Sequence, residues 1–145
     1  ISQMQSVADT IRSLDVLVVD DNRVNLKVAE RMLKKMGCRP STVGDGRQAL
    51  HAVQERAYDL VLMDIQMPIM DGMQALAEIR KLPSASANTP IYMLSALAEP
   101  RTVKKAVSIG ANGFLTKPFK VEDLGQILQE ISARAENNGA AGATA

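Results

Sequence analysis

Five short apolar runs alternate along the chain with segments of helical periodicity. The runs cover residues 16–19, 40–43, 60–63, 91–94 and 113–115. The first, third and fourth are continuously hydrophobic, which is typical of strands that are covered on both faces of a sheet. Strict alternation of strand and helix predicts a parallel sheet joined by right-handed crossovers.

The segments between the runs carry helix start and stop signals. In the segment 25–36 the inward stripe is predicted to hold Val28, Ala29, Met32, Leu33 and Met36. Asn22 is a suitable N-cap for this helix, and Gly37 stands where a helix end favours a left-handed residue. Asp45-Gly46 and Asp71-Gly72 open two further helices, and the last two cover residues 101–109 and 121–135.

Two flanks lie outside this pattern. Residues 1–14 have apolar residues at roughly helical spacing and are predicted to be a linker or an extra N-terminal helix. Residues 136–145 are small and polar and are predicted to form a flexible tail. The remaining residues, 15–135, form one predicted domain. The first residue is Ile1 rather than Met, as expected of a piece excised from a longer protein.

Composition narrows the class of protein. A chain of 145 residues that is 46% hydrophobic is globular, and its formal net charge of +1 gives no reason to expect direct binding to nucleic acid or to a membrane surface. Cys38 is the single cysteine, which excludes an internal disulfide and favours a reducing, cytoplasmic setting. No apolar stretch approaches the roughly 20 residues that span a bilayer.

Polar residues that could bind a metal or take part in a reaction follow four of the apolar runs. Asp20 and Asp21 follow the first run, and Asp64 follows the third. A parallel sheet would gather these strand-end carboxylates at one edge, where they would form a hard-oxygen site suited to Mg²⁺. One of them would be placed to act as a nucleophile towards phosphorus. Ser95 and Lys117, which follow two further runs, complete a site for taking a phosphoryl group onto a carboxylate.

Each of these residues also has an ordinary structural explanation. Asp20 and Asp21 would suit a helix N-terminus, because the helix dipole favours negative charge there. Asp64 would suit a turn, and Lys117 would suit either a surface loop or a structural ion pair with Asp64. Phe114 would suit the core. Two adjacent like charges with a third close by would repel one another without a cation, which favours the metal-site interpretation.

Four short sequence motifs follow one another along the chain. They are VVDDN, LMDIQMPIMDG, the Ser95-Ala96 pair after IYML, and FLTKPF. In these motifs the chain, from about residue 15 to 135, resembles the receiver domain of response regulators. The sequences DDNRVNLKV and LMDIQMP are most similar to those of receivers attached to hybrid histidine kinases and phosphorelays. The resemblance implies an α/β, flavodoxin-like fold: a five-stranded parallel sheet of order 2-1-3-4-5 with helices on both faces.

The resemblance also implies roles for individual residues. Asp64 would be the phosphoacceptor, and Asp20, Asp21, Asp64 and the backbone carbonyl of Gln66 would hold Mg²⁺, or alternatively Mn²⁺. Lys117 would neutralise charge on the phosphoryl group, and it would precede Pro118 through a cis bond. The donor would be the phosphohistidine of a histidine kinase or of a histidine phosphotransfer protein. The chain would be cytoplasmic, or the cytoplasmic portion of a membrane-bound hybrid kinase.

A second set of implied roles concerns switching. The hydroxyl of Ser95 would move towards the phosphoryl group, and the ring of Phe114 would then change rotamer. The face built by residues 101–109, 113–115 and 121–135 would change for a downstream protein. Gln66 and Leu97 would flank the approach of the water that hydrolyses the acyl phosphate, and our hypothesis is that they set the phosphoryl lifetime. Phosphotransfer and autodephosphorylation would be self-catalysed, without the turnover of an ordinary enzyme.

Two alternatives stay open at this point. An aspartyl-phosphate hydrolase would need a second carboxylate two residues after its nucleophile, whereas this chain has Gln66 there. A receiver that binds proteins without being phosphorylated would not need the full set of site residues, and all of them are present.

Overall fold

A five-stranded parallel sheet forms the centre of the protein. The computed structural model describes the backbone of residues 14–144 and the side chains of residues 14–134. The strands lie in the order β2-β1-β3-β4-β5, as predicted, and all neighbouring pairs are parallel. Their bounds are β1 (Asp15–Val19), β2 (Arg39–Val43), β3 (Leu60–Asp64), β4 (Ile91–Ser95) and β5 (Gly113–Thr116).

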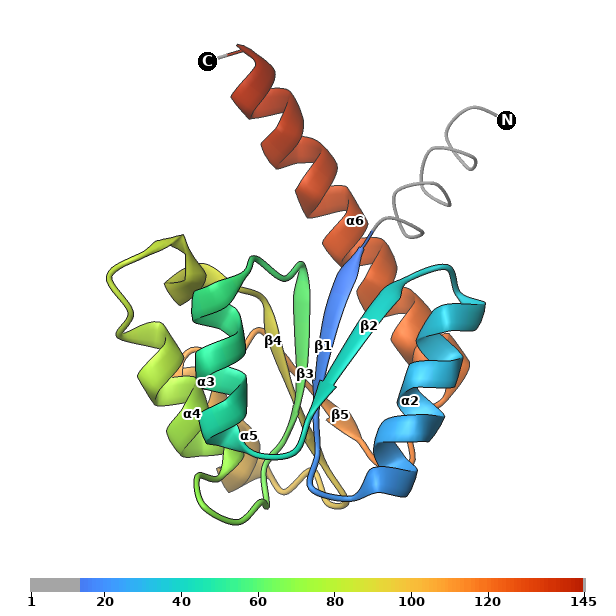
Figure 1. Cartoon of the computed structure of the whole chain (residues 1–145), viewed down its shortest axis with the longest axis vertical. Coiled ribbons are helices and arrows are strands. Elements are labelled where there is room, and N and C mark those ends of the chain that lie inside the picture. Colours follow the sequence, from blue (N-terminus) through green and yellow to red (C-terminus); the bar gives the residue numbers. More distant parts are fainter. Residues whose placement is uncertain (1–13, 145) are drawn as a thin grey trace.

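Helices cover both faces of the sheet (Figure 1). One layer contains α2 (Arg23–Lys35) and α6 (Val121–Thr144), and the other contains α3 (Gly46–Glu55), α4 (Gly72–Arg80) and α5 (Pro100–Ile109). Each layer encloses its own apolar core, because β-strand side chains alternate between the two faces. Val18 and Leu62 point towards the α2–α6 side, whereas Leu17 and Met63 point towards the α3–α4–α5 side.

The predicted helix signals operate as expected. The side chain of Asn22 accepts hydrogen bonds from two backbone N–H groups of the first turn of α2, and Asp45 and Asp71 each accept one such bond at the starts of α3 and α4. Gly37 and Gly110 follow α2 and α5 with φ angles of 90° and 128°, a conformation in which a side chain would be strained.

Two local predictions differ from the structure, and one short element was not predicted. Val28 was assigned to the inward stripe of α2 but is 54% exposed, because the buried stripe is narrower and centres on Ala29 and Leu33. Helix α6 continues to Thr144 through the segment that we expected to be a flexible tail, where the frequent alanines favour helix and no proline ends it. A short 3-10 helix, η1 (Ala85–Asn88), was not predicted.

The N-terminal prediction lies almost entirely outside the described residues. Of residues 1–14, the structure describes Leu14, which is buried in the core on the α2–α6 side. Among the described residues, no helix is long and apolar enough to cross a membrane.

Candidate functional site

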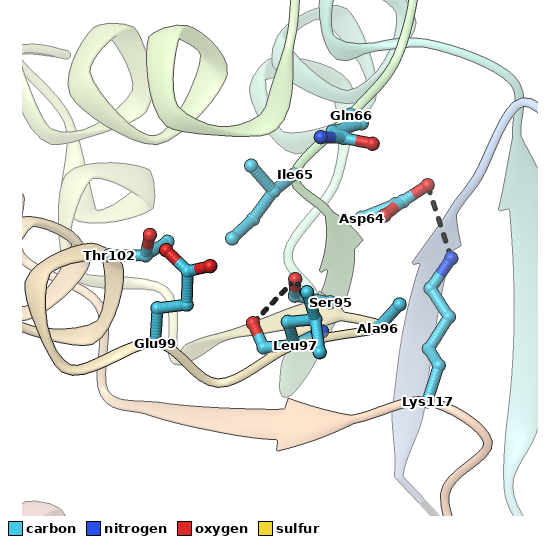
Figure 2. A pocket seen from close by; sticks show the side chains of 9 residues that line it. All are labelled: Asp64, Ile65, Gln66, Ser95, Ala96, Leu97, Glu99, Thr102 and Lys117. Carbon is cyan, nitrogen blue, oxygen red and sulfur yellow. Dashed lines mark hydrogen bonds and ion pairs between the residues drawn. The ribbon is translucent and has the colours of Figure 1, made fainter.

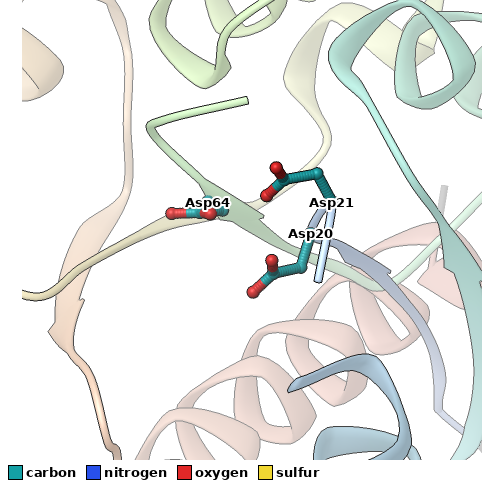
Figure 3. A group of neighbouring side chains, drawn as sticks. All are labelled: Asp20, Asp21 and Asp64. Carbon is teal, nitrogen blue, oxygen red and sulfur yellow. The ribbon is translucent and has the colours of Figure 1, made fainter. Parts of the chain in front are cut away.

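The carboxyl ends of the strands bring the predicted site residues together. Val19 pairs with Met63 in the β1–β3 register, so that Asp20 and Asp64, one residue further along each strand, lie side by side. One oxygen from each of Asp20, Asp21 and Asp64 lies within 4.8 Å of the others. Figure 3 shows the three side chains at the ends of their strands. The predicted carboxylate cluster is therefore formed.

The three carboxylates differ in burial. Asp20 is 2% exposed and Asp64 is 7% exposed, whereas Asp21 is open to solvent. Burial raises the pKa of Asp64; Lys117 opposes this rise, and the negative charge of Asp20 adds to it. A buried carboxylate beside two others is costly when charged, so this end of the sheet favours a cation.

Lys117 supplies one such cation. Its Nζ lies 3.0 Å from Asp20 Oδ2 and 3.2 Å from Asp64 Oδ2. Burial by itself lowers the pKa of Lys117, but the hydrogen bond to Asp20 and the charges of both carboxylates outweigh it and raise that pKa overall. Of the two structural explanations considered for Lys117, the ion pair with Asp64 is the one that the structure contains (Figure 2). The pairing with Asp20 was not predicted. The Lys117–Pro118 bond is cis, as predicted.

Asp20 is held by three donors. The backbone N–H of Asn22 donates to Oδ1 at 2.9 Å, and the side-chain amide of Asn25 donates to Oδ2 at 3.2 Å. Lys117 donates to the same Oδ2 at 3.0 Å. Because a buried carboxylate without partners would be strongly unfavourable, these donors explain how Asp20 is accommodated at the end of β1.

A cleft of about 360 Å³ opens beside Asp64 (Figure 2). It is lined by the predicted residues Gln66, Ser95, Leu97 and Lys117, together with four to which the sequence pattern assigned no role: Ile65, Ala96, Glu99 and Thr102. Gln66 and Leu97 are both exposed, and Leu97 has 67% of its surface accessible. The structure thus places both residues of the lifetime hypothesis beside the predicted phosphoacceptor.

Ser95 reaches this cleft from the end of β4. Its hydroxyl donates to the Leu97 carbonyl at 2.9 Å and accepts from the Leu97 N–H at 3.3 Å. The hydroxyl is therefore engaged within its own loop. Phe114 lies further back, on β5 beside Met93, half-buried against the core on the α3–α4–α5 side.

Close backbone packing fixes the loop that follows Asp64. A Cβ atom on Gly72 would overlap the backbone carbonyl of Asp64, and the Gly72 N–H donates to the Ile65 carbonyl at 2.8 Å. Ile69 has a φ of 69°, and the Met70 N–H donates to the Pro68 carbonyl at 2.7 Å across this residue. A tight turn with a β-branched residue at its centre stores backbone strain next to the site.

The donor set fits a hard divalent cation. Carboxylate oxygens are the side-chain ligands that Mg²⁺ and Mn²⁺ prefer, and three of them converge here with an excess of negative charge over Lys117. Asn25 was missed as a partner of this set. The available signal was its position in the first turn of α2, from which a short amide side chain can reach back to the strand end.

Comparisons with known proteins agree with this geometry. A family model described as the response regulator receiver domain matches residues 16–129. The sensor protein GacS of Pseudomonas syringae is 38% identical over 131 residues, which are 89% of this chain and 14% of GacS. The sensor kinase/phosphatase LuxQ of Vibrio vulnificus is 38% identical over 122 residues, 84% of this chain and 14% of LuxQ.

The sheet and its helices also match solved structures. The receiver domain of the sensor histidine kinase PA1611 from Pseudomonas aeruginosa has a TM-score of 0.77 and 37% identity, covering 83% of this chain and 98% of that one. That structure contains a magnesium ion coordinated in its active site cleft. The chain spans 14% of the length of the two sensor kinases, so the similarity concerns one of their domains.

Proposed function

The chain belongs to the response regulator receiver family of two-component signal transduction, and on that premise we propose that Asp64 accepts a phosphoryl group from a phosphohistidine. The donor would be a histidine kinase or a histidine phosphotransfer protein. The observation that carries the proposal is the position of Asp64 beside the other two acidic residues and Lys117, at the edge of an open cleft.

The reaction is a transfer between a nitrogen and an oxygen. The phosphorus–nitrogen bond of the donor breaks, a phosphorus–oxygen bond to an Asp64 carboxylate oxygen forms, and the imidazole leaves with the bond's electron pair. Asp20, Asp21, Asp64 and the Gln66 backbone carbonyl would hold Mg²⁺, which when bound neutralises charge on the phosphoryl oxygens. Phosphoryl transfer depends mainly on positioning and on such charge stabilisation.

Lys117 has two successive roles in this proposal. Before transfer, its ammonium group pairs with both Asp20 and Asp64 and offsets part of their charge. After transfer, it pairs with an oxygen of the phosphoryl group that Asp64 carries. The cost of leaving Asp20 is offset because the new partner carries more negative charge.

Ser95 and Phe114 would transmit the modification to the surface. The phosphoryl group competes with the Leu97 backbone for the Ser95 hydroxyl, so that phosphorylation redirects the loop between β4 and α5. The face formed by α5, β5 and α6 would then change for a downstream protein. A switch of this kind needs two conformations whose balance the phosphoryl group shifts.

The hybrid-kinase relatives support a place for this receiver in a phosphorelay. GacS is a sensor protein and LuxQ a sensor kinase/phosphatase, and each contains a segment similar to this chain. We infer that this chain is the receiver of such a sensor kinase, with a cytoplasmic location. A kinase activity would belong to other domains of that parent protein.

Phosphoramidate tests the donor chemistry, because its phosphorus–nitrogen bond is of the same kind as that of phosphohistidine. We expect a single phosphoryl adduct that requires Mg²⁺ and is absent from Asp64→Asn. An adduct that forms equally on Asp64→Asn would contradict the assignment. A folded wild type with no adduct, and no inorganic phosphate released from phosphoramidate above the protein-free rate, would favour a binding module that is not phosphorylated.

A further inference from the structure

Hydrogen bonds already occupy most of the acceptor positions on the Asp20 carboxylate that a metal ion could use. A carboxylate oxygen has two lone pairs, and Oδ2 of Asp20 already accepts from both Asn25 and Lys117. Oδ1 accepts from the Asn22 N–H. Among the described residues one acceptor position therefore remains on Oδ1, and a second becomes free on Oδ2 when either Lys117 or Asn25 leaves. Metal binding at Asp20 thus depends on which of these donors stay in place.

Asn22 and Asn25 both donate a hydrogen bond to Asp20, Asn22 from its backbone and Asn25 from its side chain. Asn22 uses its side-chain oxygen to cap α2, accepting from the N–H groups of Val24 and Asn25 at 2.9 and 3.2 Å. Its contact with Asp20 is made by backbone N–H, which almost any residue would supply. Asn25 contacts Asp20 through its side chain at 3.2 Å, and so its identity matters.

We propose that Asn25 is a positioning residue for the metal site, holding the Asp20 carboxylate in the orientation that a divalent cation requires. The inference rests on the proposed function, since it concerns the same carboxylate cluster. Asn25 would not touch the metal or the reacting atoms. It would act as the neutral outer partner of a metal-binding carboxylate, a type of contact whose loss commonly weakens metal binding.

Asn25 carries no charge, and this distinguishes it from Lys117 as a partner of Asp20. Lys117 competes with a cation for Asp20 because both are positive, whereas an amide N–H holds the carboxylate without repelling the incoming charge. When Lys117 leaves for a phosphoryl oxygen, Asn25 and the Asn22 N–H are the two observed donors that still fix Asp20. Without Asn25, the carboxylate is free to turn fully towards Lys117, and the cation has to displace a stronger ion pair.

Asn25→Ala tests the role of this side chain at a position where misfolding is not expected. Asn25 lies in the first turn of α2, is exposed, and is replaced by a better helix former in Asn25→Ala. The gain in helix propensity opposes the cost of losing the hydrogen bond to Asp20, so the variant should stay folded, with a thermal stability close to that of wild type when no metal is present. A loss of metal affinity in a protein of unchanged thermal stability would not come from fraying of the helix.

The experiment is a titration of the metal-free protein with Mg²⁺ by isothermal calorimetry. We expect Asn25→Ala to raise the Kd for Mg²⁺ about tenfold. Asn25→Leu, which keeps the same branched arrangement of heavy atoms but has no donor, should behave likewise. Val24→Ala is the matched control, because it removes an exposed, uncharged side chain of the same turn and should leave the Kd unchanged.

Phosphoryl uptake provides the second readout. The Mg²⁺ concentration that gives half the maximal rate of adduct formation should rise about tenfold in Asn25→Ala, in parallel with the Kd, while the rate at saturating Mg²⁺ stays the same. Equal Kd values for wild type and Asn25→Ala would overturn the inference and leave the proposed function intact. A wild type that binds no Mg²⁺ would overturn both.

Discussion

The Ser95 hydroxyl donates to the Leu97 carbonyl at 2.9 Å, and among the described residues it forms no hydrogen bond with the Asp64 carboxylate. The same oxygen accepts from the Leu97 N–H, so residues at the end of β4 form a small closed loop. Phosphorylation of Asp64 would offer the hydroxyl a charged acceptor in place of a neutral carbonyl, and hydrogen bonds to charged acceptors are the stronger ones.

Ser95→Ala should therefore separate phosphoryl uptake from loop response. We expect the variant to form the adduct, because Asp64 and Lys117 are unchanged, but to show no faster amide hydrogen exchange in residues 96–99 on phosphorylation. Wild type should show that increase, since the Leu97 N–H loses its acceptor. Ser95→Thr is the control that keeps a hydroxyl. A wild-type increase that persists in Ser95→Ala would refute the role of this hydrogen bond.

Leu97 and Gln66 offer a test of the phosphoryl lifetime. Leu97 presents an apolar side chain to the cleft, whereas a carboxylate at this position would accept a hydrogen bond from an attacking water and orient it. We expect Leu97→Glu to raise the dephosphorylation rate constant about tenfold. Gln66→Asn, which draws the amide back from the cleft, should also change it. The decay of the adduct is followed by intact mass, and unchanged rates in both variants would show that these residues do not set the lifetime.

Gly72 tests how tightly the backbone supports Asp64. A methyl group on Gly72 would overlap the Asp64 carbonyl, so Gly72→Ala should lower the free energy of unfolding by about 2 kcal/mol. Gly125→Ala is the matched control: its Cβ would meet only the end of the Met36 side chain, at 3.6 Å, and helix propensity favours a gain of up to about 1 kcal/mol. Urea unfolding measures both. A Gly72→Ala variant as stable as wild type would contradict the close packing.

The raised pKa of Asp64 predicts a pH-dependent effect on stability. The carboxyl titrates near pH 3.9 in the unfolded chain and at a higher pH in the folded protein. Protonated Asp64 thus contributes stability that is complete below the unfolded pKa and is lost as the pH rises through the folded pKa. Without metal, Asp64→Asn should be more stable than wild type at pH 7, by a margin that shrinks as the pH falls towards 4.

Urea unfolding in the presence of a chelator checks this expectation across the pH range. Added Mg²⁺ should then stabilise wild type and have less effect on Asp64→Asn, because the variant lacks one of the three carboxylates. An Asn variant that is less stable than wild type at pH 7 without metal would mean that the ion pair with Lys117 outweighs the burial of the charge.

The sequence pattern predicted the site residues because the end of each apolar run indicates where a buried strand ends. Asp20, Asp64 and Ser95 each directly follow or end an apolar run, and parallel strands bring such positions to one edge. The caps of α2, α3 and α4 were predictable for a similar reason, since short polar side chains before an amphipathic segment have few other roles. The strand order itself came from the resemblance and not from periodicity.

The missed features depend on side-chain direction and on context. Periodicity describes which face a residue occupies but not where its polar atoms point, so the contact of Asn25 with Asp20 and the closed loop at Ser95 were not predictable from it. Val28 was misassigned because five inward-facing residues were expected in this helix, whereas α2 fully buries Ala29 and Leu33 alone among the described residues. The continuation of α6 to Thr144 escaped prediction because small residues are frequent both in tails and in helices.

The central claim is that Asp64 accepts the phosphoryl group in a reaction that depends on a divalent cation. The most direct measurement is the intact mass of wild type and Asp64→Ala after incubation with acetyl phosphate, with and without Mg²⁺. We predict one phosphoryl adduct on wild type that requires Mg²⁺, and none on Asp64→Ala. An adduct of the same yield on a folded Asp64→Ala protein would contradict the account.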